Sequence, residues 1–413
     1  MNKLIGTALL GQSGGPTSVI NASAAGVFLE ALKHAEITNI LAAAHGIQGI
    51  LDENFYDIRQ EDLNELNKLL FTPSSAIGSV RYKLADVEND NTDYIKILEV
   101  FKKYNIRYFF YNGGNDSMDT CLKISRFFKS QNYECHVIGI PKTIDNDLVG
   151  IDHSPGFGSA AKYVATSIME LCLDASVYSI NQVIIVEVMG RNAGWLTASA
   201  ALAKHFGAKV DLIYLPEVPF DIDNFFTTIG DLLKKQKDIV VVVSEGIKNK
   251  NGLYIPEVYK QLDTDAFGHV SLGGTAQILA DKVKEKFAVK VRSVEFSLLQ
   301  RCAAHLASKV DIDEAFTVGK FAVINAINGV TDKFIGIKRI SNHPYHVEYP
   351  LVELDVVANS ERKVPLEWIL PNGGGLTKDF IDYSLPLIQG DSPIQYQNGL
   401  PNFAKLRKIP FKI

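Results

Sequence analysis

The stretch RYFFYNGGNDSMDTCLKISRFFKSQNYECHVIGIPKTIDND, residues 107–147, decides the fold. Two short apolar runs in it, Arg107–Tyr111 and His136–Ile140, have the length of buried strands, and Asp116–Lys129 between them has a helical pattern. A strand, a helix and a second strand in this order form a βαβ unit, in which the two strands run parallel. The stretch therefore predicts α/β architecture with a mainly parallel sheet.

The same alternation continues on both sides of this unit. The other predicted strands are Leu4–Leu10, Asn39–Ala44, Gln182–Val188, Asp211–Leu215 and Asp238–Val243. The other predicted helices are Ser18–Lys33, Gly158–Leu173, Arg191–His205 and Asn224–Lys235. A shift toward Gly, Pro, His and Asp at 149–157 marks a boundary between two α/β halves. We therefore expect one domain in 1–150, a second in 151–300, and helices with an irregular tail packing across both in 301–413.

Composition excludes several classes of function. A formal net charge of −5 over 413 residues gives no electrostatic case for binding nucleic acid or an anionic membrane. No run reaches the ~18 apolar residues of a membrane span. The four cysteines have neither metal-site spacing nor a disulfide framework, which is typical of a reducing compartment. We therefore expect a cytoplasmic protein without nucleic-acid or membrane partners.

Glycine-rich turns follow two of the predicted strands. Gly11–Gly15 (GQSGG) and Gly113–Ser117 (GGNDS) each lead into a predicted helix. Backbone N–H groups in such turns bind phosphate with help from the helix N-terminus. Ligands of open α/β sheets bind at the carboxyl ends of the strands, so two such turns indicate a phosphate site, although either alone is also an ordinary connection. Arg81 could clamp a phosphate at long reach, or be a solvated side chain.

A cluster of charges follows the strand His136–Ile140. The segment Pro141–Asp147 (PKTIDND) contains one cation, Lys142, and two carboxylates, Asp145 and Asp147. In extended chain these two carboxylates point to the same side, so one could take a proton from a hydroxyl while the other orients a metal. Alone, Asp-Asn-Asp favours an Asx-turn. Beside two phosphate turns, it predicts phosphoryl transfer to an alcohol.

Polar groups also follow strands of the second half. In Met189-Gly190-Arg191 the glycine permits close approach of a ligand, and Arg191, at the start of a predicted helix, could hold a sugar phosphate. Glu245 offers an acceptor for sugar hydroxyls, or a cap. Arg292 and Arg301 could bind phosphate through their planar guanidinium groups, although surface arginines beside a strand are the alternative.

With these segments in order, the chain resembles the phosphofructokinase family, specifically its pyrophosphate-dependent branch. The resemblance extends from the first turn through Gln300-Arg301 and continues in tail motifs such as Phe380–Tyr383. It implies two Rossmann-like three-layer α/β/α domains with an irregular tail. It also implies a Mg2+-dependent, reversible phosphoryl transfer from pyrophosphate to the 1-hydroxyl of fructose 6-phosphate, a step of glycolysis and gluconeogenesis.

The resemblance implies roles for matching positions. Gly14 contacts the donor phosphate, and Asp145 is the base that takes the proton from the sugar 1-hydroxyl. Arg292 resembles an arginine lent by a neighbouring subunit, which implies a homodimer or homotetramer. The implied sugar-phosphate contacts are Thr143, Ile144, Asp145, Met189, Gly190, Arg191, Glu245, Leu298, Leu299, Gln300 and Arg301.

Two positions bear on the choice of donor, and a third on the metal. ATP-using relatives have glycine in place of Asp116 and usually of Lys142. In the family view Asp116 repels the α-phosphate of ATP, and Lys142 stabilises the transferring phosphates.

Asn115 stands where most members have the aspartate that contacts Mg2+. Its amide oxygen can still ligate but brings no charge, so we expect Mg2+ to rely more on Asp145, Asp147 and the pyrophosphate oxygens.

Two alternatives stay open at this point. An ATP-dependent sugar-phosphate kinase is opposed by Asp116 and Lys142. A non-catalytic sugar-phosphate sensor has only Asn115 in its favour, because a site without catalysis has no chemical reason to keep Asp145, Asp147 and Lys142.

Overall fold

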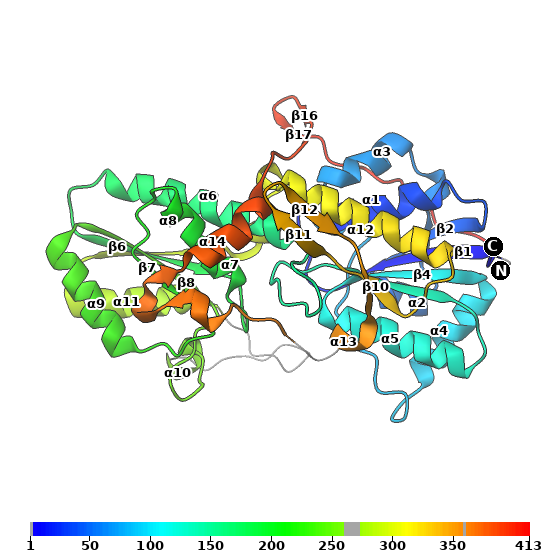
Figure 1. Cartoon of the computed structure of the whole chain (residues 1–413), viewed down its shortest axis with the longest axis horizontal. Coiled ribbons are helices and arrows are strands. Elements are labelled where there is room, and N and C mark those ends of the chain that lie inside the picture. Colours follow the sequence, from blue (N-terminus) through cyan, green and yellow to red (C-terminus); the bar gives the residue numbers. More distant parts are fainter. Residues whose placement is uncertain (1–2, 260–272, 358–360) are drawn as a thin grey trace.

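Two lobes lie side by side, each built on its own central sheet with helices on both faces (Figure 1). The structure is a computed structural model that describes residues 3–259, 273–357 and 361–413. The expected α/β class with mainly parallel sheets is confirmed.

The first sheet has seven strands in the order β13-β10-β5-β4-β1-β2-β3. The five inner strands are parallel to one another, and the two edge strands, β3 and β13, run antiparallel to their neighbours. The strands are β1 (Gly6–Gln12), β2 (Ile37–Ala43), β3 (Phe55–Asp57), β4 (Ile106–Gly113), β5 (His136–Pro141), β10 (Lys333–Ile335) and β13 (Leu351–Glu353). The last two come from the C-terminal region, where the sequence predicted only helices and tail.

Helices cover both faces of this sheet because its strands are apolar on both sides. In β4, Tyr108 and Phe110 pack with one helix pair, whereas Phe109 and Tyr111 pack with the other, as alternation along a strand requires. The first pair is α1 (Ile20–Ala31) and α12 (Lys309–Ile327). The second pair is α4 (Thr92–Lys103) and α5 (Asn115–Ser130).

The second sheet has four parallel strands in the order β7-β8-β6-β9. They are β6 (Gln182–Val188), β7 (Leu212–Tyr214), β8 (Asp238–Ser244) and β9 (Lys290–Glu295). One face is covered by α6 (Phe157–Ser176), α7 (Trp195–Ala198) and α8 (Ala200–His205). The other face is covered by α9 (Ile222–Lys235) and α11 (Thr275–Phe287).

The predicted helix from Arg191 to His205 is wrong at its start. The chain becomes helical only at Trp195, so Arg191 lies in a turn and not at a helix start. Gly190 has a φ of +139°, which helical backbone excludes, and the Gly194 N–H group donates to Glu217 Oε1 at 2.8 Å. The backbone angle at Gly190 and the hydrogen bond at Gly194 together hold the segment in a non-helical turn.

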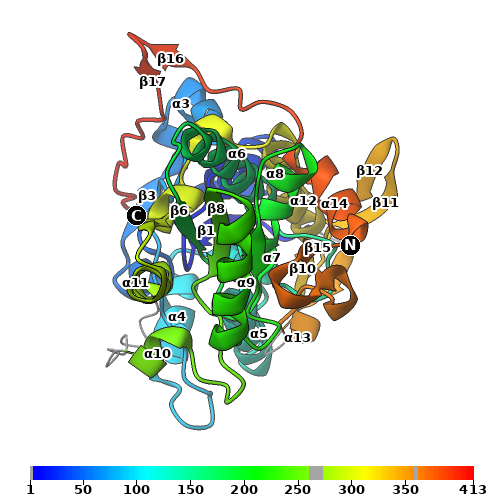
Figure 2. The same ribbon diagram turned by 90° about the vertical axis from the view of Figure 1, so that its left-hand side faces the viewer.

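The C-terminal region contacts both lobes. Phe380 packs in the core of the second lobe, and Phe411 N donates to Phe55 O of the first lobe at 2.9 Å. Two hairpins, β11–β12 and β16–β17, stand out from the body (Figure 2). The remaining elements are α2 (Gly46–Leu51), α3 (Leu63–Lys68), α10 (Ile255–Tyr259), α13 (Leu354–Val357), α14 (Lys378–Ser384), β11 (Lys338–Asn342), β12 (Tyr345–Glu348), β14 (Ile369–Leu370), β15 (Gly375–Leu376), β16 (Tyr396–Gln397) and β17 (Leu400–Pro401).

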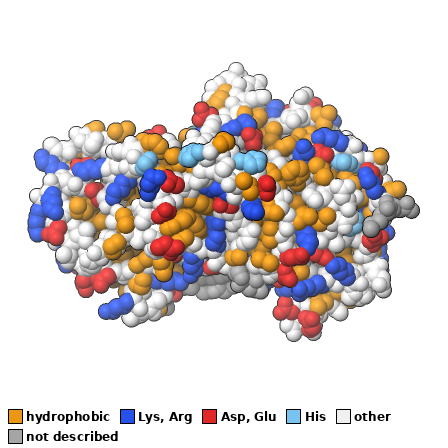
Figure 3. Space-filling view, viewed as in Figure 1, with side chains coloured by type: hydrophobic (Ala, Val, Ile, Leu, Met, Phe, Trp, Pro, Cys, Tyr) orange, Lys and Arg blue, Asp and Glu red, His pale blue; other side chains and the backbone are white. Residues whose placement is uncertain are grey.

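Charge is distributed evenly on the visible face. Figure 3 shows basic and acidic side chains interspersed over both lobes. Within the described residues, no helix combines the length and the hydrophobicity that crossing a bilayer requires.

Candidate active site

Three turns meet at the carboxyl edge of the first sheet. β1, β4 and β5 are neighbours that end together, with Gln12 opposite Asn112 and Gly113 opposite Pro141. Backbone hydrogen bonds continue past the strands, because Lys142 N donates to Gly113 O at 3.0 Å. The two glycine turns and the charged segment, predicted separately from the sequence, therefore lie side by side.

Cations converge on the first glycine turn. Lys142 Nζ donates to Gly15 O at 2.7 Å. A Cβ atom added to Gly14 would lie 3.4 Å from Lys142 Nζ, and one added to Gly15 would lie 3.0 Å from Arg301 Nη1. Arg81 is near enough for its charge to act on both Lys142 and Arg301. The turn thus faces three positive charges that an anion would balance.

Gly14 is bonded within the fold through its backbone, and its expected contact with the donor phosphate stays a prediction. Its N–H group already donates to Val80 O at 3.0 Å, so this group is not directed at a ligand. The residue has a φ of +72°, which favours glycine, and its missing side chain leaves the space in front of Lys142 open. Gly14 therefore provides room for a phosphate.

The Lys142 side chain is buried at the bottom of this cluster, with 3% of its surface exposed. Burial lowers the pKa of Lys142 to about 8, opposed by the carboxylates of Asp145 and Asp147 and reinforced by Arg301 and Arg81. A bound anion would favour the charged ammonium group.

In the segment after β5, burial alternates between neighbouring residues, although Asn146 has a φ of +56° and the chain is not fully extended. Ile144 and Asn146 are buried, whereas Asp145 and Asp147 are half-buried. Loss of hydration raises the pKa of Asp145, opposed by Lys142. Burial, together with the charges of Asp145 and Glu361, raises the pKa of Asp147 to about 7. For both carboxyl groups, the loss of hydration outweighs the positive charge of the nearby Lys142.

The residues expected to contact a metal lie together. Asn115 Nδ2 donates to Asp147 Oδ2 at 3.2 Å, and Asn115 Oδ1 is buried without a hydrogen-bond partner among the described residues. Asn115 Oδ1 has no hydrogen-bond partner among the described residues, and burial opposes ionisation of the neighbouring Asp147 carboxyl group. A bound cation would interact favourably with both groups. Among the described residues, no three His, Cys, Asp or Glu side chains lie together in a way that could hold a metal ion. Mg2+ would fit this set, since it commonly takes one or two protein groups and completes its shell with phosphate oxygens and water.

The second lobe brings its own polar turns to the same place. β6 and β8 end together, so Glu245 N donates to Val188 O at 3.0 Å, and Glu245 Oε1 accepts from Gly190 N at 3.2 Å. Burial raises the pKa of Glu245 to about 7, opposed by the Gly190 N–H group and reinforced by the charge of Asp145. Glu245 of the second lobe is therefore near enough to Asp145 for the two negative charges to interact.

Neighbouring residues complete this side. Gln300 is buried, and its Oε1 accepts from Met189 N at 3.2 Å. The positive charge of Arg191 opposes the rise in the pKa of Glu245, so Arg191 lies near that carboxyl group. Met189, Arg191, Glu245 and Gln300 thus lie together, and Arg301 directly follows Gln300.

Other predicted site residues are not joined to this group. Asp116 is exposed in the first turn of α5, Leu298 and Leu299 are 55% and 61% exposed, and Arg292 is exposed on the edge strand β9. Among the described residues, no hydrogen bond or ion pair links the side chains of these four residues to the cluster.

Glu361 is a site residue that sequence reasoning missed. Its negative charge raises the pKa of both Asp145 and Asp147, and its Oε1 accepts from Asn192 Nδ2 at 3.0 Å. It comes from the tail, far from both partners in the sequence. A lone glutamate in an irregular segment carries no pattern that would have revealed it.

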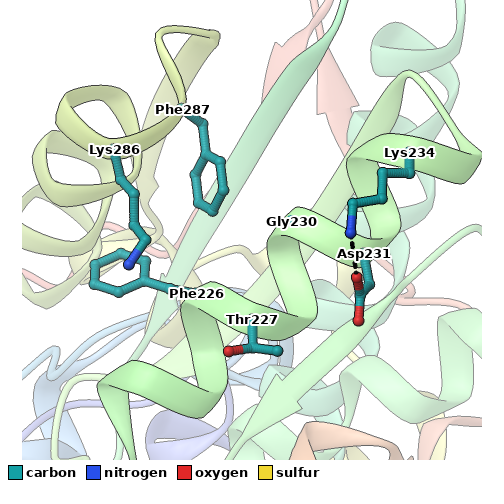
Figure 4. Close-up of a pocket in the computed structure, with 7 residues that line it drawn as sticks. All are labelled: Phe226, Thr227, Gly230, Asp231, Lys234, Lys286 and Phe287. Carbon is teal, nitrogen blue, oxygen red and sulfur yellow. Dashed lines mark hydrogen bonds and ion pairs between the residues drawn. The ribbon is translucent and has the colours of Figure 1, made fainter.

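A separate surface hollow lies on the second lobe between α9 and α11 (Figure 4). Its volume is about 390 Å3, and Lys286 Nζ lies 4.5 Å from the centroid of the Phe226 ring. None of the residues that line it belongs to the cluster described above.

Comparison with known proteins identifies close relatives of this chain. The sequence profile described as Phosphofructokinase matches residues 7–320. A protein of Halomonas elongata named pyrophosphate–fructose 6-phosphate 1-phosphotransferase is 44% identical over 405 residues, which cover 97% of this chain and 96% of that protein. A protein of the same name from Xanthomonas campestris is 43% identical over 98% of this chain and 97% of that protein.

Solved structures agree with the sequence comparison. The crystal structure of a pyrophosphate-dependent phosphofructokinase from Nitrosospira multiformis has a TM-score of 0.89 to this chain at 38% identity. The match covers 98% of both chains.

Proposed function

This chain belongs to the phosphofructokinase family, and we propose that it transfers a phosphoryl group reversibly from pyrophosphate to the 1-hydroxyl of fructose 6-phosphate. The products are fructose 1,6-bisphosphate and phosphate. The observation that carries the proposal is the position of Asp145. Its carboxyl group is near enough to interact electrostatically with Lys142 and Arg301 at the glycine turn, and with Glu245 in the other lobe. The base thus lies between a place for a donor and a place for an acceptor.

The chain's residues supply the proton transfer and the electrostatic stabilisation. Asp145 takes the proton of the sugar 1-hydroxyl while that oxygen forms a bond to the nearer phosphorus and the bond to the leaving phosphate breaks. A raised pKa suits a base that must hold this proton near neutral pH. Lys142, Arg301 and Arg81 balance the negative charge of the transferring and leaving phosphates.

The sugar is held by the second lobe. Thr143 and Ile144 line the acceptor with Asp145, Glu245 accepts from sugar hydroxyls, and Arg191 contacts the 6-phosphate. The proposal includes further contacts with the sugar phosphate, made by Met189, Gly190, Leu298, Leu299, Gln300 and Arg301.

Mg2+ is the proposed metal, held by Asn115 and Asp147. When bound, it would neutralise phosphate charge and orient the phosphoryl group. The support is the buried Asn115 Oδ1 atom without a partner among the described residues, next to a carboxyl group whose pKa is raised to about 7.

Donor choice rests on Asp116 and Lys142. Asp116 is exposed in the first turn of α5, where its carboxylate would repel an additional phosphate of a nucleoside triphosphate. Lys142 lies behind the glycine turn, within reach of both phosphates of a small donor. We therefore propose pyrophosphate, and not ATP, as the substrate.

We further propose a cytoplasmic homodimer or homotetramer. Arg292 is exposed on the edge strand β9, where it is accessible to a second copy, and in this proposal it reaches the sugar phosphate bound by that copy. All four cysteines are free thiols, as is usual in a reducing compartment.

A coupled assay tests the function. Purified protein with fructose 6-phosphate and Mg2+ should form fructose 1,6-bisphosphate with pyrophosphate as donor and show no turnover with ATP. Turnover with ATP alone would overturn the donor assignment. Absence of turnover with both donors, together with measurable fructose 6-phosphate binding, would favour the sugar-phosphate sensor.

A further inference from the structure

A short segment of the tail, Glu361–Val364, connects the two lobes beside the active site; we name it the bridging segment. Arg362 N donates to Asp147 O at 2.7 Å, which fixes the segment to the loop that carries the base. Arg362 O accepts from Trp195 Nε1 at 3.0 Å, and Val364 N donates to Glu217 Oε1 at 3.0 Å, so the same segment is fixed to the second lobe.

The side chains of the bridging segment make a second set of contacts. Glu361 Oε1 accepts from Asn192 Nδ2 at 3.0 Å, and Asn192 directly follows Arg191 of the sugar-binding turn. The Arg362 guanidinium group donates to the Tyr383 hydroxyl at 2.7 Å and lies 4.5 Å from the centroid of the Trp195 ring.

The far end of the sugar-binding turn reaches the same segment indirectly. Glu217 Oε1 accepts from Gly194 N at 2.8 Å as well as from Val364 N. The turn from Gly190 to Gly194 is therefore held at Asn192 by Glu361 and at Gly194 by the carboxylate that it shares with Val364. Both attachments lead to the segment that is bonded to Asp147.

From these contacts we propose that the bridging segment positions the sugar-binding turn relative to the base Asp145, and that Glu361 is a positioning residue acting through its bond to Asn192. This inference rests on the proposed function. A base must come within about 2.6–3.2 Å of the group whose proton it takes, and a misplacement of about 1 Å can reduce the rate about 100-fold. The bridging segment connects the loop of Asp145 to the sugar-binding turn, so it sets the distance between the base and the bound sugar.

Mutation of Glu361 isolates the Glu361–Asn192 bond, whereas Asn192→Ala also removes a bond that Asn192 Oδ1 accepts from the Tyr254 hydroxyl at 3.3 Å. The other ties use backbone groups, or the partly buried Arg362, whose loss would disturb packing. Glu361 is exposed and Asn192 is half-buried, so truncation leaves no large cavity. Glu361→Gln retains an oxygen that can accept from Asn192 and removes the charge, which separates positioning from electrostatics.

The experiment compares the wild type with four variants: Glu361→Ala, Asn192→Ala, the double variant, and Glu361→Gln. We expect kcat with pyrophosphate to fall about tenfold in each alanine variant. The double variant should lose no more than the worse single one, because both remove the same bond. Glu361→Gln should retain at least about half of the wild-type kcat, since its amide oxygen preserves the bond.

Binding and stability measurements exclude other causes. Fructose 6-phosphate binding, measured by calorimetry without donor, should stay within about twofold of the wild type in all variants. Their thermal midpoints should match the wild type. Three outcomes would each overturn the proposal. The reductions in kcat could multiply in the double variant, Glu361→Gln could lose as much kcat as Glu361→Ala, or sugar binding could weaken tenfold. Absence of turnover in the wild type would instead overturn the function itself.

Discussion

Two clusters of charge include residues of the loop that follows β5, and they differ in how their charges are stabilised. The site cluster consists of Lys142, Asp145 and Asp147. The histidine cluster consists of Asp152, His153, Glu314 and Arg339.

The histidine cluster is electrostatically complete. His153 is held between Asp152 Oδ1 at 2.7 Å and Glu314 Oε2 at 2.6 Å, and Arg339 Nη2 donates to Asp152 at 2.8 Å. Burial alone would lower the pKa of His153, but the two carboxylates outweigh it and raise the pKa to about 9. Burial likewise opposes ionisation of Asp152, yet His153 and Arg339 lower its pKa. His153 is thus held by hydrogen bonds within the fold.

The site cluster is electrostatically incomplete. The pKa of Lys142 is lowered and those of Asp145 and Asp147 are raised, so each group is displaced toward its neutral form. Such displacement marks a site that is completed by charged ligands, here the proposed pyrophosphate and Mg2+. The comparison teaches that burial of charge alone does not indicate function; the two clusters differ in whether opposite charges within the fold outweigh the cost of burial.

The largest effect is expected at the base. Asp145→Asn removes the proton acceptor with little change in shape, so kcat should fall about 10²–10⁴-fold while fructose 6-phosphate still binds. Steady-state kinetics and calorimetry measure the two quantities. Asp119→Asn, on the outer side of α5, is the matched control and should retain activity. Near-normal turnover of Asp145→Asn would remove this residue from the mechanism.

The histidine cluster should affect stability in a pH-dependent way. His153→Gln leaves Glu314 without its cationic partner and should lower the free energy of unfolding by about 3–5 kcal/mol at pH 6. Since the folded-state pKa of about 9 exceeds the unfolded value of about 6.5, this stabilisation is complete below pH 6.5 and is lost as pH rises through 9.

Denaturant unfolding of the wild type and the variant between pH 6 and 10 measures this loss. The difference in the free energy of unfolding between the two proteins should decrease toward pH 10. The exposed His305→Gln is the control and should change stability by less than about 0.5 kcal/mol. A gap that stays constant across this pH range would show that His153 contributes through packing and not through charge.

The smallest effect is expected at the metal position. Asn115→Asp adds a carboxylate beside Asp147, so the Mg2+ concentration for half-maximal rate should fall about fivefold, which corresponds to about 1 kcal/mol. Electron paramagnetic resonance with Mn2+ and pyrophosphate should show tighter binding independently of turnover. An unchanged requirement for the metal would place Asn115 away from the ion.

Much of the fold followed from local sequence. The strand Gln182–Val188 was predicted at its observed bounds, and the turns at Gly113 and Lys142 were placed at the correct sheet edge, because strand length, helical period and glycine turns are properties of neighbouring residues. The start of the helix at Trp195 was missed because Gly190 and the distant Glu217 hold the preceding turn.

The short segments of sequence therefore determined the α/β architecture, the glycine turns and the identities of the charged residues that follow the strands. The folded chain decided which of those charges have partners. His153 meets Glu314, and Glu361 meets Asn192, across more than 100 residues of sequence. Electrostatic energy depends on distance in space and on burial, and neither can be read from local sequence.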